Sequence, residues 1–331
     1  MPVRDVIIIG AGPSGLSAAI AAKTHGLDYQ VLEQGVLVNS IFRFPPQIVF
    51  FTTPELLEIG GIPFVSPYEK PTRNEALNYY RRIVDRFDLQ ISLGETVVAV
   101  SRGDEDAFEI QTRSTGSAQT RLRQARHVIF AIGYYDHPVM LGIPGEDLPH
   151  VSHYYREAHP FYRQRVVIVG GGNSAAEAAL ELYRTGAHVT LVHRAPALKS
   201  TIKYWVRPDI ENRIKEGSIA ARFNACITTI RPKSVLLKAA ECGDAIEEIP
   251  ADAVLLLTGY RADSDLMTRA GVRLTERDAP EVDPETFETN VPGVFVAGGA
   301  IAGVDTGTIF IENGRFHGDR IIETIAKRSK I

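Results

Sequence analysis

Residues 5–15 read DVIIIGAGPSG and residues 165–175 read RVVIVGGGNSA, so one chain carries two copies of the same pattern. In each copy a run of β-branched residues leads into two glycines separated by one residue. A small residue, Gly15 or Ala175, follows three positions after the second glycine. The copies continue in step into the next apolar run, with no insertion or deletion between them. An internal repeat of this kind predicts the same local structure twice.

Each copy is typical of a strand–turn–helix unit that binds a dinucleotide. The apolar run predicts a strand buried on both faces, Val6–Ile9 in the first copy and Val166–Val169 in the second. The first glycine allows a tight turn, the second lets a pyrophosphate approach the backbone, and the third small residue lets helix and strand pack closely. The helix that follows would direct its free N–H groups at the phosphates. These positions are Gly10, Gly12 and Gly15 in the first copy, and Gly170, Gly172 and Ala175 in the second.

The two copies differ at the position that reads the ribose. Glu33 is an acid that can accept hydrogen bonds from ribose hydroxyls and would repel a 2′-phosphate, so the first copy predicts FAD or NAD. The second copy has His193 and Arg194 there, with Lys199 and Lys203 downstream. Cationic side chains with no competing acid suit a 2′-phosphate, which an arginine can bind through two hydrogen bonds. The second copy therefore predicts NADPH.

Length, charge and hydropathy narrow the class of protein further. A chain of 331 residues with 44% hydrophobic and 23% charged residues has the composition of a globular protein with two domains. A net charge of −4 and a pI near 6.2 give no polybasic surface for nucleic acid. The longest apolar run is far shorter than the ~18 residues of a membrane span, so we expect a cytoplasmic protein with neither a nucleic-acid nor a membrane partner. The two cysteines, Cys226 and Cys242, form no C-x-x-C motif and suggest ordinary reduced side chains.

The predicted fold class is α/β, with two Rossmann-like, doubly wound dinucleotide-binding domains, the second inserted in the first. Residues 1–137 would form the first part of an FAD-binding domain, residues 138–260 an NADPH-binding domain, and residues 261–331 the second part of the FAD-binding domain. Proline and glycine in Tyr134–Gly145 indicate a linker, and Thr258–Ala262 would be the matching return. The two segments would form the hinge pair of the molecule.

Other segments carry weaker signals. Val36–Thr53 is rich in aromatic residues and contains two prolines, so we expect an irregular wall beside a flat ring system. Thr308–Ala326 predicts a mostly helical return to the first domain, capped by Thr306 or Thr308, with its N-terminus facing the first-domain cofactor. We also expect a helix over Asn74–Phe87 and an antiparallel meander of strands over Val97–Arg102, Phe108–Thr112 and Gln119–Arg123. His127–Gly133 is expected to be a buried strand that ends in a glycine turn.

These motifs, taken in chain order, resemble the flavoproteins built like low-molecular-weight thioredoxin reductases. Beyond the two glycine motifs the resemblance rests on Ala131–Gly133, Thr258–Gly259 and Phe295–Gly298. Within that group the chain is most similar to the YpdA-type flavoproteins, which are bacillithiol disulfide reductase-like. The residues that carry this second likeness are AIGYY at 131–135, SHYYREAHP at 152–160, TIFIENGRFHG at 308–318 and PTRNEALNYY at 71–80. It extends over essentially the whole chain.

The resemblance implies an NADPH-dependent flavoprotein reductase in which hydride passes from NADPH to FAD and electrons pass on to a low-molecular-weight, bacillithiol-like disulfide. It also implies a small-molecule or small-protein electron acceptor, a homodimer or homotetramer, and no metal. The residues implied for FAD are Gly10, Gly12, Pro13, Ser14, Gly15, Glu33, Gln34, Gln47, Gly133, Gly298, Asp305, Thr308 and Ile309. Those implied for NADPH are Gly170, Gly172, Asn173, Ser174, Ala175, His193, Arg194, Lys199 and Gly259.

The chain departs from the family pattern at three points. Thioredoxin reductases carry a C-x-x-C motif before the second glycine motif, whereas Val151–Arg165 contains no cysteine, so this chain cannot relay electrons through a dithiol. The YpdA-type pattern has cysteine where Ser14 stands, and a serine hydroxyl cannot form a mixed disulfide. The usual Asp of the last FAD motif is replaced by Gly299, and Asp305 could take its place. No catalytic residue is therefore assigned.

Three other functions fit the same motifs. A ferredoxin- or flavodoxin-NADP reductase on this scaffold also lacks C-x-x-C, and Arg121, Arg123 and Arg126 would be its candidate docking cluster. A flavin monooxygenase is a further alternative, suggested by the sequence IPGEDLPH at 143–150 and the HYY that begins at His153. A redox sensor that binds both cofactors is the non-enzymatic alternative. Three histidines could act as acids near the flavin, or serve only as hydrogen-bonded structural residues: His153, His159 and His317.

Overall fold

The computed structural model describes residues 3–103, 107–239 and 246–328. The chain divides into two compact units, one formed by Met1–His137 with Tyr260–Ile331 and the other by Pro138–Gly259. Within the described residues, no helix combines the length and the apolar character needed to cross a membrane. Of the two cysteines, Cys226 is a free thiol in a strand, and Cys242 lies outside the described residues.

The first unit is built on a seven-stranded mixed sheet. Its strands follow the order β3-β2-β1-β6-β5-β4, and β17 pairs with β6. Strands β1, β2, β3, the end of β6 and β17 run parallel, whereas β4, β5 and the start of β6 form an antiparallel meander. The strands are β1 Arg4–Ile9, β2 Tyr29–Glu33, β3 Ile91–Leu93, β4 Glu95–Arg102, β5 Phe108–Ser114, β6 Thr120–Phe130 and β17 Val294–Val296.

Both faces of β1 are buried, as its apolar run predicts. Alternate residues of β1 serve two different cores, because successive side chains of a strand point to opposite faces. Val6 and Ile8 pack in the core beneath α1, α3 and α8. Ile7 and Ile9 pack in a second core with residues of the meander and of α6. The helices of this unit are α1 Pro13–Thr24, α2 Asn39–Arg43, α3 Arg73–Phe87, α6 Ser264–Arg269, α7 Ile311–Gly314 and α8 His317–Arg328, with short 3-10 turns η1 Pro54–Leu57 and η3 Gly298–Ala302.

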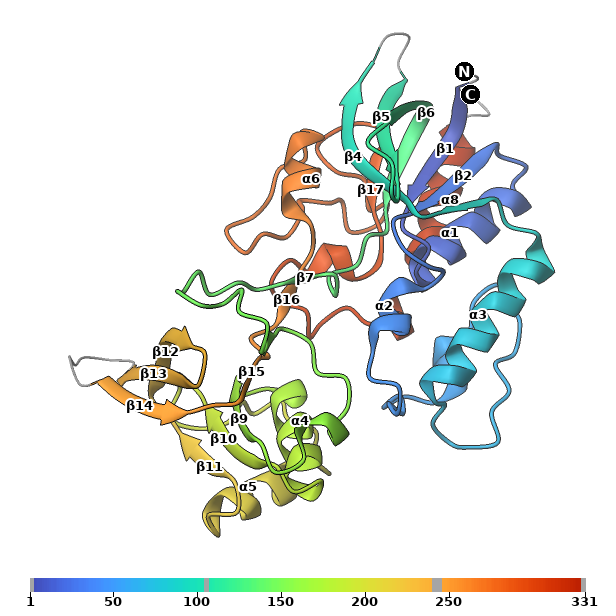
Figure 1. The fold of residues 1–331 in the computed structure, drawn as a ribbon. Helices are drawn as coiled ribbons and strands as arrows, with labels where there is room; N and C mark the ends of the chain where they lie inside the picture. Colours follow the sequence, from blue (N-terminus) through green and yellow to red (C-terminus); the bar gives the residue numbers. More distant parts are fainter. Residues whose placement is uncertain (1–2, 104–106, 240–245, 329–331) are drawn as a thin grey trace. The chain divides into compact units, whose positions relative to one another are not determined.

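The C-terminal helix packs against the first helix of the chain (Figure 1). A Cβ atom at Gly318 would collide with the backbone of Ala18, so only glycine allows α8 to approach α1 this closely. The Ser17 hydroxyl in α1 also donates a hydrogen bond of 2.6 Å to the carbonyl oxygen of Arg315. These contacts place Arg315 and α8 beside α1, the helix that follows the first glycine motif.

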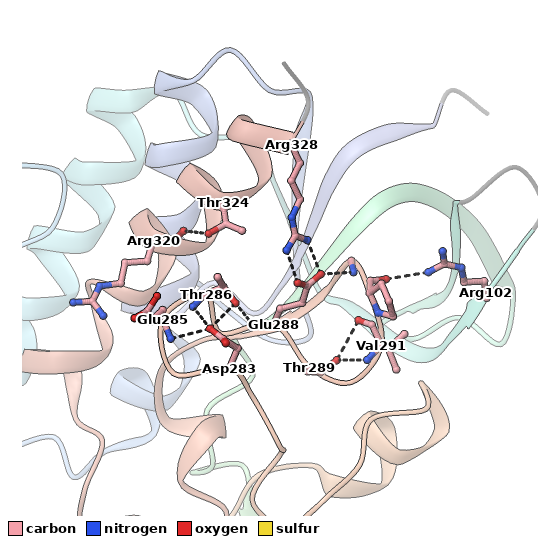
Figure 2. Close-up of polar contacts among 12 residues, drawn as sticks. Arg102, Asp283, Glu285, Thr286, Glu288, Thr289, Val291, Arg320, Thr324 and Arg328 are labelled. Atoms are coloured by element: carbon pink, nitrogen blue, oxygen red, sulfur yellow. Dashed lines mark hydrogen bonds and ion pairs between the residues drawn. The ribbon is translucent and has the colours of Figure 1, made fainter. Parts of the chain in front are cut away.

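The end of α8 is fixed by one ion pair (Figure 2). Arg328 donates two hydrogen bonds of 2.7 Å to the two carboxylate oxygens of Glu288. The same carboxylate accepts the Gly293 N–H at 2.9 Å, and Arg102 donates to the neighbouring Pro292 carbonyl at 2.9 Å. The turn that precedes Glu288 is closed by Asp283, whose carboxylate accepts hydrogen bonds from the residues that follow it. The pair therefore ties α8 to the loop that enters β17.

The second unit repeats the plan of the first. Its five parallel strands follow the order β11-β10-β9-β15-β8, and a separate three-stranded antiparallel sheet has the order β12-β13-β14. Val166 and Ile168 of β9 pack with α4 and α5, while Val167 packs with the antiparallel sheet. The elements are β8 Val151–Ser152, η2 His159–Phe161, β9 Arg165–Val169, α4 Asn173–Arg184, β10 His188–Val192, α5 Arg207–Lys215, β11 Ala220–Arg222, β12 Ala225–Arg231, β13 Ser234–Ala239, β14 Ile246–Pro250 and β15 Ala253–Leu256.

The two connections between the units contain β7 (His137–Pro138) and β16 (Tyr260–Arg261), which form a two-stranded sheet. The predicted fold class is confirmed: each unit has a set of parallel strands flanked by helices, and the second unit is inserted in the chain of the first.

Three local predictions were wrong in detail. The strands expected over Gln119–Arg123 and His127–Gly133 are one continuous strand, β6, which ends at Phe130 and whose two halves pair with β5 and β1. Val36–Thr53 is not wholly irregular, since α2 forms before the first proline can break it. The expected helix over Thr308–Ala326 is divided into α7 and α8.

The capping predictions also need correction. Neither Thr306 nor Thr308 caps α7. The helix begins after Phe310, whose N–H donates to the Asn313 side chain at 2.8 Å, and the Thr308 hydroxyl donates to the Asp305 carbonyl instead. By contrast, the sequence contains a capping signal that marks the start of α3, one residue before the expected start at Asn74. Thr72 and Glu75 form a reciprocal capping box, so the helix begins at Arg73.

Candidate cofactor-binding sites

The first glycine motif forms the turn between β1 and α1. Gly10 has φ +107°, and a Cβ atom there would collide with the carbonyl oxygen of Ala131 at the end of β6. A Cβ atom at Gly15 would collide with the Gly10 carbonyl. Glycine is therefore required at both positions by the close approach of backbone segments, and also at Gly10 by its left-handed φ. The turn lies at the carboxyl ends of β1 and β6, the edge at which ligands bind in doubly wound sheets.

The start of α1 is open to an anion. A Cβ atom at Gly12 would meet no atom within 4 Å, and no side chain of the described residues caps the helix. Helices α3 and α6, in contrast, are capped by Thr72 and Asp263. Pro13 occupies the first turn, where its missing N–H costs nothing. An uncapped helix start beside open space fits a bound pyrophosphate.

Glu33 closes the other side of this turn. Only 5% of the residue is exposed, and its two carboxylate oxygens accept the N–H groups of Ala11 at 2.9 Å and Gly35 at 2.8 Å. Burial raises the pKa of this carboxyl, and the nearby Asp136 carboxylate raises it further. The two backbone N–H groups oppose that shift and hold the carboxylate in one orientation. Each oxygen keeps a lone pair, so the carboxylate can accept hydrogen bonds from the two hydroxyls of an adenosine ribose.

Asp136 is a polar residue that no sequence motif signals. Its carboxylate accepts hydrogen bonds from Gln34 at 3.0 Å, Asn39 at 3.2 Å and Arg43 at 2.8 Å. Gln34, an implied FAD residue, therefore has its amide engaged by the protein. Nothing in the sequence signals this cluster, because Asp136 and Gln34 are separated by 102 positions.

Ser14 lies against two glycines from the C-terminal part of the chain, Gly298 and Gly314. Its side chain would collide with a Cβ atom at Gly298, and its Oγ would be 3.3 Å from one at Gly314. The Gly298 N–H donates to Nδ1 of His317 at 3.2 Å, and the His317 ring stacks on Phe287 with a centroid distance of 4.1 Å. Burial lowers the pKa of His317 to about 4, assisted by the charge of Arg320. His317 is therefore neutral and acts as a hydrogen-bond acceptor here.

The remaining implied FAD residues lie in loops of the same unit. Gly133 has φ +61°, and a Cβ atom there would meet nothing within 4 Å. The Asp305 carboxylate accepts a 2.6 Å hydrogen bond from Arg277, so this acid is already paired. Gln47 lies between α2 and η1, while Thr308 and Ile309 lie in the segment before α7.

The second glycine motif repeats this geometry between β9 and α4. Gly170 has φ +151°, and a Cβ atom there would lie 2.5 Å from the carbonyl oxygen of Leu257 and 3.1 Å from the Cβ of Ala175. A Cβ atom at Gly171 would collide with the His193 ring, so this ring lies against the turn. Gly172 has only the Cδ atom of Lys199 near its Cβ position, at 3.9 Å, and α4 has no side-chain cap among the described residues.

Cationic side chains cluster around His193, at the expected ribose position of the second unit. Arg194 and Lys199 are exposed, and neither forms an ion pair with an acid of the described chain. Burial lowers the pKa of the His193 ring, and the charges of Lys199 and Arg194 lower it further. Lys203, in contrast, donates to Glu177 at 2.6 Å and is compensated. The cationic groups open to a 2′-phosphate are thus Arg194 and Lys199, beside a neutral His193.

Other residues of the second site are held by the protein itself. The Asn173 amide bonds to the backbone of Thr201 and Lys203, whereas Ser174 is exposed at the start of α4. Gly259 has φ +110°, and its carbonyl accepts the Val139 N–H at 3.0 Å. The Asn173 contacts are not visible in the sequence, because the loop that provides them has no motif.

The cluster of arginines considered for protein docking does not form a patch. Arg123 donates two hydrogen bonds, of 2.6 and 2.7 Å, to the buried carboxylate of Glu95. Arg126 lies on the opposite face of β6 from Arg121 and Arg123, because side chains alternate along a strand. One of the three arginines is thus compensated, and another faces away.

Two dinucleotide-binding units, one with an acid and one with cations at the ribose position, define a flavin-dependent pyridine nucleotide oxidoreductase. The chain belongs to the pyridine nucleotide-disulphide oxidoreductase family, whose model matches residues 7–298. It is 43% identical over 326 residues to bacilliredoxin reductase Bdr of Bacillus subtilis (strain 168), covering 98% of each chain.

Two solved structures have the same fold along their whole length. Bacillithiol disulfide reductase Bdr (YpdA) from Bacillus cereus is 38% identical with a TM-score of 0.94, covering 99% of this chain and 100% of that one. The corresponding protein from Staphylococcus aureus is 37% identical with a TM-score of 0.91, covering 99% of each chain. The predicted resemblance is confirmed, and the chain is an oxidoreductase that uses FAD and NADPH.

Proposed function

We propose that the unit formed by residues 1–137 and 261–331 binds FAD and that residues 138–260 bind NADPH. The acid Glu33, fixed by two backbone N–H groups, supports an unphosphorylated ribose in the first unit. In the second unit, Arg194 and Lys199 are exposed and have no acidic partner among the described residues, which supports binding of a 2′-phosphate. The open helix starts at Gly12 and Gly172 would each hold a pyrophosphate. When bound, NADPH and FAD supply hydride transfer and two-electron chemistry.

We further propose that the electron acceptor is a low-molecular-weight disulfide of the bacillithiol type. The observation that supports this choice is the likeness, at 38% and 37% identity over 99% of this chain, to two proteins named bacillithiol disulfide reductase. Reduction of the disulfide takes two electrons and two protons and releases two thiols, while NADPH becomes NADP⁺. Residues 1–137 and 261–331 contain no cysteine, so no thiol of that unit can form a mixed disulfide with the substrate. Electrons would therefore pass directly from the flavin to the disulfide, without a thiol of the protein as an intermediate carrier.

The role of the protein is then to hold and orient the two dinucleotides and to admit the disulfide. Ser14 stands at the turn in place of the family cysteine, and its hydroxyl has too high a pKa to act as a thiolate would. His317 cannot donate a proton from Nδ1, because that atom accepts the Gly298 N–H. A single-electron carrier such as ferredoxin is the second candidate acceptor, but the arginine cluster that would dock it is not assembled.

An anaerobic reoxidation experiment tests the acceptor. The purified flavoprotein is reduced with one equivalent of NADPH, and flavin absorbance is followed as bacillithiol disulfide, ferredoxin, flavodoxin or oxygen is added separately. We expect rapid reoxidation by bacillithiol disulfide alone. Reoxidation only by ferredoxin or flavodoxin would make the chain a ferredoxin/flavodoxin-NADP reductase. Rapid reoxidation only by oxygen would favour the flavin monooxygenase alternative.

We also propose a cytoplasmic homodimer or homotetramer. The resemblance to low-molecular-weight thioredoxin reductases supports this assembly. Light scattering coupled to size-exclusion chromatography measures the mass directly, and a monomer across the micromolar range would contradict the proposal. Fractionation of the producing cells tests the location.

A further inference from the structure

A short loop of the second unit is tied down over the phosphate-binding turn. We call residues 199–203 the strap. At its start, the Lys199 N–H donates to the Gly171 carbonyl at 2.9 Å. At its end, the Asn173 side chain donates to the Thr201 carbonyl at 3.2 Å and accepts the Lys203 N–H at 2.9 Å. Both polar atoms of the Asn173 amide are therefore used to hold the strap.

The strap fixes the backbone that carries Lys199. The Lys199 carbonyl accepts a hydrogen bond from Arg207, so its peptide groups are held on both sides. Its side chain passes over Gly172, with Cδ 3.9 Å from the position of a Cβ atom there. Gly171, which receives the Lys199 N–H, is also the residue against which the His193 ring lies. The strap and the His193 ring therefore both contact the backbone turn that contains Gly171.

The two lysines of the strap differ in their surroundings. The Lys203 ammonium pairs with Glu177 at 2.6 Å and lies 5.7 Å from the ring centroid of Trp205. The Lys199 ammonium is exposed and has no acidic partner in the described chain. One cation therefore serves the structure, and the other remains free to bind an anion.

We propose that Asn173 is a positioning residue that sets the preference of the second unit for a 2′-phosphate. Its amide holds the strap, and the strap holds Lys199 beside His193 and Arg194. A lysine on an unrestrained loop would lose more conformational entropy on binding the phosphate, so pre-ordering it raises affinity for the phosphorylated nucleotide alone. This inference rests on the proposed function, in which the second unit binds NADPH.

Binding measurements on the FAD-loaded protein test the inference. Calorimetry gives the dissociation constants of NADP⁺ and NAD⁺ for the wild type, Asn173→Ala, Lys199→Ala and the double variant. We expect each single change to reduce the preference for NADP⁺ about 10-fold, the usual size of one hydrogen bond to a charged group. Since Asn173 acts through Lys199, the double variant should also lose about 10-fold, whereas independent effects would give about 100-fold.

The controls separate the possible failures. Asn212→Ala changes an exposed asparagine in α5 of the same unit and should leave both constants unchanged. Equal weakening of NADP⁺ and NAD⁺ by Asn173→Ala would show that Asn173 serves a part that both nucleotides share, and would overturn the inference. Additive losses in the double variant would overturn it as well. A wild type that prefers NAD⁺ would instead refute the proposed function.

Thermal melting of each variant without nucleotide gives a second readout. We expect Asn173→Ala and Lys199→Ala to melt within a few degrees of the wild type, since Lys199 is exposed and Asn173 is only half-buried. If the alanine variant melts early, Asn173→Ser repeats the binding measurement with a residue that is favoured at helix starts. Serine cannot span the two contacts of the Asn173 amide, so the same loss of preference is expected.

Discussion

The ring of Tyr134 occupies the space that a side chain at Gly299 would need. A Cβ atom at position 299 would lie 2.8 Å from two carbons of the ring. Gly299 does not have a left-handed φ, so its backbone does not require glycine. The Tyr134 ring crowds this position instead, so the acidic residue usual there in related flavoproteins would have to displace the ring. Burial also raises the pKa of Tyr134, which keeps its hydroxyl protonated.

Gly299→Ala should therefore destabilise the protein only while the Tyr134 ring is present. We expect a loss of about 1–3 kcal/mol in the free energy of unfolding, the usual cost of overpacking. In a Tyr134→Ala background the same change should cost less than about 0.5 kcal/mol, because the space is vacant. Urea unfolding of the four proteins gives the coupling. Gly307→Ala is the matched control, since a Cβ atom there meets nothing within 4 Å. Equal costs in both backgrounds would show that the ring is not the obstacle.

Arg194→Ala should weaken NADPH and leave NADH nearly unaffected. Arg194 is exposed and has no acidic partner in the described chain, so its removal breaks no internal ion pair. Loss of a charged hydrogen bond to the 2′-phosphate should raise the KM for NADPH about 10-fold. Steady-state kinetics with both nucleotides measures the ratio. A similar rise for NADH would contradict the phosphate-reading role.

The stability of the first unit should depend on pH through His317. Its pKa is lowered to about 4 by burial, compared with about 6.5 for an unperturbed histidine. The unfolded chain therefore binds a proton that the folded chain does not, and stability falls as the pH drops from about 6.5 toward 4. The full shift corresponds to about 3 kcal/mol. Denaturant unfolding between pH 7 and 5 measures this slope.

His317→Gln is the variant that isolates the effect. Glutamine can still accept the Gly298 N–H but cannot titrate, so the slope of stability against pH should decrease in this range. An unchanged slope would assign the pH dependence to other groups.

The ion pair at the end of α8 should contribute measurably to stability. Arg328→Ala removes both hydrogen bonds to Glu288 (Figure 2). Because the Arg328 side chain is 49% exposed, solvent screening limits the expected loss to about 1 kcal/mol. Lys327→Ala is the control, since Lys327 is 79% exposed and lies 4.0 Å from its partner Glu323.

The same pair has a defined pH window. Arg328 lowers the pKa of Glu288, so the stabilisation is present above the ordinary pKa of a glutamate and is lost as the pH falls through the lowered value. The difference in unfolding free energy between wild type and Arg328→Ala should therefore shrink below about pH 4. A constant difference across this range would contradict a charge-based role.

The sequence by itself determined the two strand–turn–helix units and the contrast between Glu33 and Arg194. These features follow from local chemistry, because glycine spacing, apolar runs and the residue that ends the next strand all act within about 30 positions. Long elements were predictable for the same reason. The division of the C-terminal helix was not predictable; Arg315, which lies between α7 and α8, forms hydrogen bonds with Ser17 and Glu55 in distant segments.

Only the tertiary structure decided how the side chains at these sites are engaged. Asp136 binds Gln34, the Tyr134 ring crowds Gly299, and Asn173 holds a loop. Each partner lies tens of positions or more away along the chain, and no local pattern signals which of many polar residues will meet. Close packing sets these pairs, because a buried or crowded group must find the partner that the fold places next to it.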